Sequence, residues 1–182
     1  MTRQLETKLA GLVLIEPEVH GDERGFLVET FREDLWRDLG VEVAFVQHNH
    51  SRSTRGTLRG LHFQTDPGQA KLIRCTRGSI FDVVVDLRRN SPTYGRWEGQ
   101  GLDDRRHRQL FVPVGFAHGF VVTSEVADVA YKLSSYYDPS REGGFAWDDP
   151  EVAIDWPITH PVLSARDRTA PRFAEIAESL PW

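Results

Sequence analysis

QLFVPVGFAHGFVV, at residues 109–122, contains two short apolar runs on either side of a Pro-x-Gly turn. Short runs rich in Val, Ile and Phe, separated by Gly, Pro and Asp, are typical of strands joined by turns. The same pattern extends outward in both directions, and it predicts about ten strands. We expect them at residues 11–15, 26–31, 43–50, 57–64, 70–77, 80–87, 96–102, 109–112, 119–122 and 127–136.

The regular spacing of these runs indicates an antiparallel sandwich or barrel, because no helical pattern lies between them to form parallel crossovers. Helical periodicity is confined to residues 33–39 and 173–180. The chain of 182 residues falls within the size range of one domain, and no repeat or linker divides it. We therefore predict a single all-β domain over residues 1–182 with a few short peripheral helices.

Composition excludes several classes of protein. Hydrophobic residues make up 40% and charged residues 27% of the chain, which is ordinary for a globular protein. The net charge of -5 gives no reason to expect a nucleic-acid partner. Cys75 is the only cysteine, so no intramolecular disulfide forms. The first 17 residues contain neither a signal-peptide core nor a membrane span, so we expect a cytoplasmic protein without a membrane partner.

Polar residues share strand faces with apolar ones at several positions. Alternate residues of a strand lie on one face, so such a residue is either a hydrogen-bonded core residue or part of a cavity wall. Three expected strands follow this pattern, with Gln47 and Asn49 on one, Lys71 on another, and Tyr131 on a third. Because polar groups converge from several strands, the sequence favours a ligand cavity inside the sandwich.

Two segments resemble the paired metal-binding motifs of cupin barrels. Residues 113–118, PVGFAH, match the Pro-x-Gly-x-x-His core of the second motif. In the first motif His62 is present, but Gln64 stands in place of the second His and Lys71 in place of the Glu. A cation repels a divalent ion and an amide is a poor substitute for imidazole, so we expect no metal at this site.

Cupins that replace the metal ligands in this way resemble the dTDP-4-dehydrorhamnose 3,5-epimerase family. The similarity runs from about residue 11 to residue 174, and it rests on GDERGF at 21–26, FVQHNHSRS at 45–53, LRGLHFQ at 58–64, AKLIRC at 70–75, FDVVVDLRRNSPTYGRW at 81–97, QLFVPVGFAHGF at 109–120 and LSARDRTAP at 163–171. It implies a cupin-type jelly roll and an isomerase that needs no cofactor. The implied substrate is a dTDP-linked 4-keto-6-deoxyhexose, inverted at C3 and C5 in deoxysugar biosynthesis of the dTDP-L-rhamnose type.

The implied chemistry is the removal and return of a proton beside the C4 ketone. Such a hydrogen becomes removable when a base lies next to it and a cation or donor stabilises the enolate oxygen. His62 suits the base and Lys71 suits the stabilising cation, while the resemblance makes Tyr131 the acid on the opposite face. His62 and Tyr131 could each instead be a core side chain whose polar atoms are hydrogen-bonded within the protein.

Asp167 matches the family position whose carboxylate orients the catalytic histidine. A competing interpretation is a helix capping box in which Asp167 bonds the backbone of Ser164. The spacing alone favours the cap, and the whole string LSARDRTAP favours the pair with His62.

The resemblance also implies a set of binding residues. Arg59 and His118 would lie near the diphosphate or the sugar, since the planar guanidinium engages two oxygens at once. Gln47, Asn49 and Tyr137 would line the cavity.

A bulge is expected between Arg59 and His62. The two residues have opposite parity in a regular strand, and Gly60 between them is a residue that often marks a bulge. Such a bulge would bring both side chains into one site.

Arg24 and Glu29 correspond to family positions that reach the nucleotide, often from the neighbouring subunit, so the resemblance implies a homodimer. The alternative is an exposed charged pair. Leu27 and Val28 replace aromatic residues that the family often carries there, which leaves the nucleotide preference less defined.

Three rival functions fit parts of the same pattern. A relative that inverts only C3 or only C5 would use the same residues. A metal-dependent cupin enzyme would need bound metal, and a non-catalytic sugar-binding cupin would need the cavity without the proton-transfer pair.

Overall fold

Strands dominate the chain in the computed structural model, which describes residues 2–182. In the first half they are β1 (Arg3–Leu5), β2 (Val13–Glu16), β3 (Val19–Asp22), β4 (Gly25–Val28), β5 (Gln47–Thr54), β6 (Leu58–Gln64) and β7 (Lys71–Arg77). In the second half they are β8 (Ser79–Asp86), β9 (Trp97–Asp103), β10 (Gln109–Val112), β11 (Phe116–Val122), β12 (Val126–Leu133) and β13 (Glu142–Gly144). The helices are α1 (Glu33–Asp38), α2 (Ala165–Arg168) and α3 (Phe173–Ala177).

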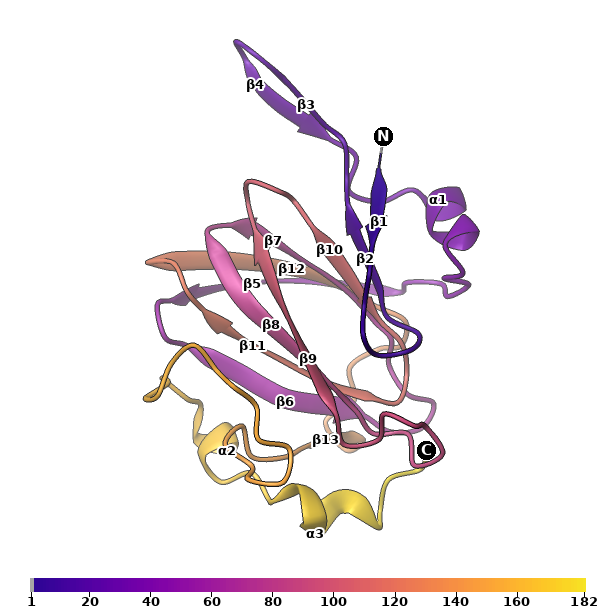
Figure 1. The fold of residues 1–182 in the computed structure, drawn as a ribbon, viewed down its shortest axis with the longest axis vertical. Helices are drawn as coiled ribbons and strands as arrows, with labels where there is room; N and C mark the ends of the chain where they lie inside the picture. The colour runs from indigo at the N-terminus through magenta and orange to yellow at the C-terminus, as the bar shows by residue number, and fades with distance from the viewer. Residues whose placement is uncertain (1) are drawn as a thin grey trace.

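Two large antiparallel sheets form the body of the molecule, and the β3–β4 hairpin forms a third, small sheet (Figure 1). The strand order is β1-β2-β10-β7-β12-β5 in the six-stranded sheet and β13-β6-β11-β8-β9 in the five-stranded sheet. Strands that are distant in sequence are therefore neighbours, as in a jelly roll. The all-β prediction is confirmed.

The space between the sheets holds the main hydrophobic core. Ile73 and Val129 enter it from the six-stranded sheet, and Ile80, Val84 and Phe120 enter it from the five-stranded sheet. Each fully buried aliphatic or aromatic side chain stabilises the fold by roughly 1.5–3 kcal/mol. This core occupies one part of the interior, and the polar side chains described below occupy the other.

Segments outside the sheets cover their outer faces. The C-terminal part of the chain, with Phe145, Trp156 and Phe173, packs on the five-stranded sheet. Figure 1 shows α2 and α3 on that side, next to β6 and β13. Trp36 of α1 and Val41 pack on the opposite, six-stranded sheet. None of the helices in residues 2–182 is long and apolar enough to span a membrane.

One strand, expected at residues 43–50, lies instead at residues 47–54 as β5. Residues 43–46 are not part of β5, and Val43 and Phe45 pack with α1 in the outer cluster instead of sharing the inner face of Gln47 and Asn49. The cause is competition between two apolar surfaces, because Phe45 finds an aromatic partner in Phe31 with ring centroids 5.7 Å apart. The strands β1, β3 and β13 and the short helix α2 were not predicted.

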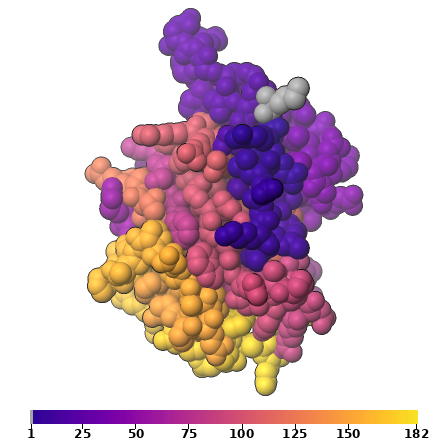
Figure 2. All heavy atoms as spheres, in the orientation of Figure 1, coloured from indigo at the N-terminus to yellow at the C-terminus, as the bar shows by residue number. Residues whose placement is uncertain are grey.

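The β3–β4 hairpin projects beyond the body of the molecule (Figures 1 and 2). Its residues Phe26 and Leu27 are 62% and 71% exposed, although large apolar side chains favour burial. Arg24, at the turn of the hairpin, forms an ion pair with Asp22. The hairpin thus presents Leu27 and charged groups to solvent, while the partly exposed ring of Phe26 also contacts the ring of His107, with centroids 4.7 Å apart.

Candidate active site

A cavity of about 620 Å³ opens between the two sheets. Its walls include every predicted site residue except Arg24 and Glu29, namely Gln47, Asn49, Arg59, His62, Lys71, His118, Tyr131, Tyr137 and Asp167. The polar residues of β5, β6, β7, β11 and β12 converge there because alternate positions of each strand point inward. The convergence that the parity of these strands predicted is therefore present.

His62 on β6 bonds to Asp167, with 2.7 Å between Nε2 and Oδ1. Asp167 is the third residue of the short helix α2, whose N-cap Ser164 accepts a hydrogen bond from the Asp167 backbone N–H at 3.1 Å. The Asp167 carboxylate therefore pairs with His62, and the cap that forms at Ser164 uses the Asp167 backbone N–H in place of the predicted bond between the carboxylate and the Ser164 backbone. This arrangement leaves Nδ1 of His62 as the nitrogen available to a molecule in the cavity.

Asp167 is buried, with 6% of its surface exposed. Desolvation raises the pKa of its carboxyl, but interactions with His62, Ser164 and Arg166 together outweigh that effect, so the pKa lies below its usual value. The carboxylate is thus charged at neutral pH and can stabilise an imidazolium.

Lys71 on β7 lies across the cavity from β6, where its Nζ donates to the carbonyl oxygen of His62 at 3.5 Å. Desolvation lowers the pKa of Lys71 to about 8, although the charges of Glu142 and Asp82 act in the opposite direction. The side chain is therefore a cation at neutral pH that can also act as a proton donor.

Tyr131 occupies the wall opposite His62. It belongs to β12 of the six-stranded sheet, where its register partners are Ile73 on β7 and Asn49 on β5. His62 belongs to the five-stranded sheet. A flat molecule in the cavity would thus meet an imidazole on one face and a phenol on the other.

The expected bulge in β6 is present. On β11, His118 and Phe120 are two residues apart, and they pair with His62 and Arg59, which are three apart. Gly60 accommodates the extra residue with a φ of 121°, a conformation that favours glycine. Arg59 and His62 therefore both face the cavity despite their opposite parity.

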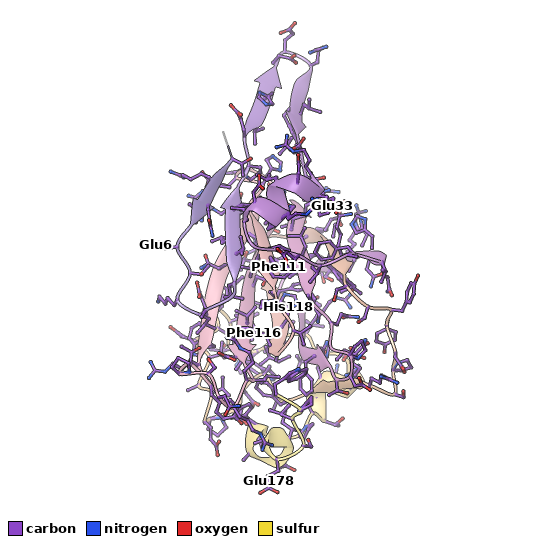
Figure 3. The ribbon with its side chains drawn as sticks, turned by 90° about the vertical axis from the view of Figure 1, so that its right-hand side faces the viewer. Glu6, Glu33, Phe111, Phe116, His118 and Glu178 are labelled. Carbon is purple, nitrogen blue, oxygen red and sulfur yellow. The ribbon has the colours of Figure 1, made fainter. Side chains whose placement is uncertain are left out.

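His118 on β11 forms a second histidine–carboxylate pair that the sequence did not reveal. Its Nε2 lies 2.9 Å from Oδ2 of Asp82 on β8, and Asp82 is fully buried. Figure 3 shows His118 within the body of strands. The available signal was an acidic residue inside the apolar run FDVVVD, which is the same criterion that singled out Lys71.

Hydrogen bonds organise the mouth of the cavity. Gln47 donates to Asn49 at 3.0 Å and accepts from the backbone N–H of Tyr137 at 2.9 Å. The Tyr137 hydroxyl donates to Glu142 at 2.8 Å, and Glu142 also forms an ion pair with Arg166. Glu142 and Arg166 line the cavity but were not predicted, because their segments carry no strand periodicity.

Arg24 and Glu29 do not reach the cavity of their own chain. The side chain of Arg24 is 84% exposed on the projecting hairpin, and that of Glu29 is 53% exposed beside Arg32. Within residues 2–182, no group of three or more His, Cys, Asp or Glu side chains is arranged to hold a metal ion.

Residues 6–175 match the sequence profile of the family described as dTDP-4-dehydrorhamnose 3,5-epimerase. The chain belongs to this family. A dTDP-4-dehydrorhamnose 3,5-epimerase of Methanothermobacter thermautotrophicus is 50% identical over 169 residues, which cover 91% of each chain.

Solved structures of epimerases share the fold. A 3,5-epimerase of Legionella pneumophila in complex with dTDP-4-keto-L-rhamnose matches with a TM-score of 0.96 and 45% identity, over 100% of this chain and 98% of that one. A 3'-monoepimerase of Streptomyces bikiniensis in complex with dTDP-quinovose matches with a TM-score of 0.89 and 38% identity, over 95% of this chain and 89% of that one.

Membership in the dTDP-4-dehydrorhamnose 3,5-epimerase family confirms two expectations from the sequence. The fold is a cupin-type jelly roll, and the protein is an isomerase of the class that acts on carbohydrates.

Proposed function

We propose that the protein inverts C3 and C5 of a dTDP-linked 4-keto-6-deoxyhexose, as a step in deoxysugar biosynthesis of the dTDP-L-rhamnose type. The observation that carries this proposal is the opposition of His62 and Tyr131 across one cavity, with the imidazole held by Asp167. A base and an acid on opposite faces of a sugar are what inversion at a carbon requires.

Each inversion begins when Nδ1 of His62 takes the proton from the carbon beside the ketone. The electron pair moves to the C4 oxygen, where the Lys71 ammonium stabilises the enolate. The phenol of Tyr131 then returns a proton to the carbon from the other face. Asp167 offsets the positive charge that His62 acquires, and its bond to Nε2 fixes the tautomer.

The remaining cavity residues would hold the nucleotide and the sugar. Arg59 and His118 supply positive or donor groups for the diphosphate, and Arg59 is itself held by Ser53, whose Oγ accepts from Nε at 3.0 Å. Gln47 and Asn49 line the sugar site, and the ring of Tyr137 at the mouth of the cavity would pack against the thymine of the nucleotide.

The projecting hairpin supports a homodimer. Arg24 and Glu29 would reach the nucleotide in the cavity of the partner subunit, and Phe26 and Leu27 would become buried there. The nucleotide-sugar substrate and the lone, buried Cys75 favour a cytoplasmic location.

Proton NMR of dTDP-4-keto-6-deoxyglucose in deuterated water tests the proposal, with chelator-treated protein. We expect deuterium at both C3 and C5, and none with His62→Ala. The matched control is His48→Ala, because His48 lies on the outer face of β5 and does not line the cavity. Absence of exchange with the wild-type protein would refute the substrate assignment, and loss of exchange on metal removal would favour a metal-dependent enzyme.

A second candidate function is inversion at C3 or C5 alone. The similarity to the 3'-monoepimerase of Streptomyces bikiniensis favours it, since the same fold supports a single inversion there. Deuterium at only one carbon in the same experiment would establish this alternative. Tight binding of the nucleotide sugar without any exchange would instead indicate a non-catalytic sugar-binding protein.

A further inference from the structure

Ser51 has a buried hydroxyl in the wall of the cavity. Its Oγ exposes less than 1 Å² and has no hydrogen-bond partner within residues 2–182. Only one other side-chain atom in that range shares this condition, Oδ1 of Asp82, which belongs to the pair with His118. Buried hydroxyls are normally paired, because an unpaired one loses its bonds to water without replacement.

The other inward-facing polar residues of β5 are already engaged. Gln47 bonds to Asn49 and to the backbone of Tyr137, and Ser53 accepts from Arg59. Ser51 lies between these groups on the same face of the strand, and it lines the cavity. On the inner face of β5, the Ser51 hydroxyl therefore lacks a hydrogen bond within residues 2–182, while Gln47, Asn49 and Ser53 each form at least one.

The register places Ser51 relative to the substrate. Asn49 is directly opposite Tyr131, and Ser51 is one inward position further along β5, towards Ser53 and the Arg59 that it holds. If Tyr131 serves C3 and C5 and Arg59 serves the diphosphate on C1, the ring atoms between them are C2 and the ring oxygen, and of these only C2 carries a hydroxyl. C2 carries a hydroxyl that the epimerisation leaves unchanged.

We propose that Ser51 is a specificity-determining residue whose hydroxyl turns into the cavity by rotation about χ1, between staggered rotamers, and hydrogen-bonds the C2 hydroxyl of the hexose. This inference rests on the proposed function, because it uses the roles assigned to Tyr131 and Arg59. A site built to bond a hydroxyl rejects the analogue that lacks it, since the protein group then stays buried and unpaired. Ser51 would thus select 2-hydroxylated over 2-deoxy substrates by about 10- to 100-fold.

The test compares kcat/KM for dTDP-4-keto-6-deoxyglucose and its 2-deoxy analogue. We expect the wild-type protein to prefer the hydroxylated substrate and Ser51→Ala to reduce the ratio to near one. The matched control is Ser53→Ala, on the same strand and face. Because Ser53 holds Arg59, that variant should slow both substrates and leave their ratio unchanged.

Binding measurements separate failure of this inference from failure of the proposed function. Calorimetric Kd values for dTDP-6-deoxyglucose and its 2-deoxy form need no turnover, and the same collapse of preference is expected in Ser51→Ala. An unchanged preference in Ser51→Ala would overturn the inference. A loss of affinity for dTDP alone in that variant would also overturn it, because the hydroxyl would then serve the diphosphate.

Discussion

His62 and His118 are direct register partners across β6 and β11, and each ring bonds a buried carboxylate through Nε2. The carboxylates come from different parts of the fold. Asp82 belongs to the neighbouring strand β8, whereas Asp167 belongs to a helix 105 residues beyond its histidine. The two histidine–carboxylate pairs are therefore neighbours. Their different proposed roles predict different effects when either carboxylate is replaced.

Asp167→Asn should mainly slow the chemical step. The amide retains the shape of the carboxylate but cannot stabilise the imidazolium, and it can favour the wrong tautomer of His62. We expect kcat to fall by about 10²- to 10⁴-fold with little change in KM, by analogy with other histidine–carboxylate pairs. Steady-state kinetics measure both values, and an effect confined to KM would contradict the orienting role.

Asp82→Asn should mainly weaken binding. His118 would lose the charge that orients its ring, and the proposed contact with the diphosphate would weaken. We expect a rise in the Kd for dTDP of about tenfold, in line with one charge-assisted hydrogen bond. Calorimetry with dTDP gives this value, and an unchanged Kd with a lower kcat would move His118 into the acid–base chemistry.

The Lys71 ammonium predicts an alkaline limit to activity. Because its pKa lies at about 8, the cation that stabilises the enolate is lost as pH rises through that value. We expect kcat/KM to fall above pH 8. The Lys71→Arg variant stays charged, so we expect it to be slower but to lose this alkaline decrease in kcat/KM. If kcat/KM of Lys71→Arg still fell above pH 8, the titrating group would be another residue.

Lys71→Met should stabilise the protein while abolishing turnover. The folded-state pKa of about 8 lies below the ordinary lysine pKa of 10.5, so the unfolded chain binds more protons between these values and stability rises with pH there. Below pH 8 the cost of burying the charge is fully present, at about 3 kcal/mol. Urea unfolding at pH 7 should show this gain, and at pH 10 the difference should shrink.

Gly60→Ala should disrupt the bulge that aligns Arg59 with His62. A Cβ at Gly60 would lie 2.6 Å from the Cα of Gly119 and 2.7 Å from the carbonyl oxygen of His118. We expect a loss of at least about 2 kcal/mol in unfolding free energy. Gly101→Ala in β9 is the control, since nothing lies within 4 Å of its added Cβ, and it should change stability by less than about 1 kcal/mol.

Mixing two inactive variants tests the trans role of the hairpin. If Arg24 serves the partner's cavity, a mixed dimer of Arg24→Ala and His62→Ala subunits contains one site with both wild-type groups. Activity should therefore reappear on mixing after subunit exchange. No recovery in dimers shown to be mixed would place Arg24 in its own subunit's site or in neither.

Strand parity and a glycine predicted part of the site because they are local signals, whereas Asp167, Arg59 and His118 were indicated by the resemblance to the family. Gln47, Lys71 and Tyr131 each share one face of their own strand with apolar residues at alternate positions. Gly60 indicated the bulge that places Arg59 and His62 on one face. These properties depend on neighbours within a few residues, so they are readable before the fold is known.

The remaining features depend on contacts between distant segments. Asp82 gains its role only when β8 pairs with β11, and Glu142 and Arg166 meet Tyr137 only after the C-terminal segment has packed. Val43 and Phe45 left the predicted strand because α1 offered them a competing apolar surface. Parity within one strand contains no information about such choices.

The bond between His62 and Asp167 makes the proposed chemistry depend on a segment that follows every strand of the two sheets. The sheets are complete by Gly144, yet Val162, Leu163, Ser164, Arg166 and Asp167 form part of the cavity wall. A nascent chain that ended before residue 162 would lack this wall and the buried Phe173 and Leu180, which pack with the five-stranded sheet. The proposed pair of His62 and Asp167 can therefore form only after α2 has left the ribosome.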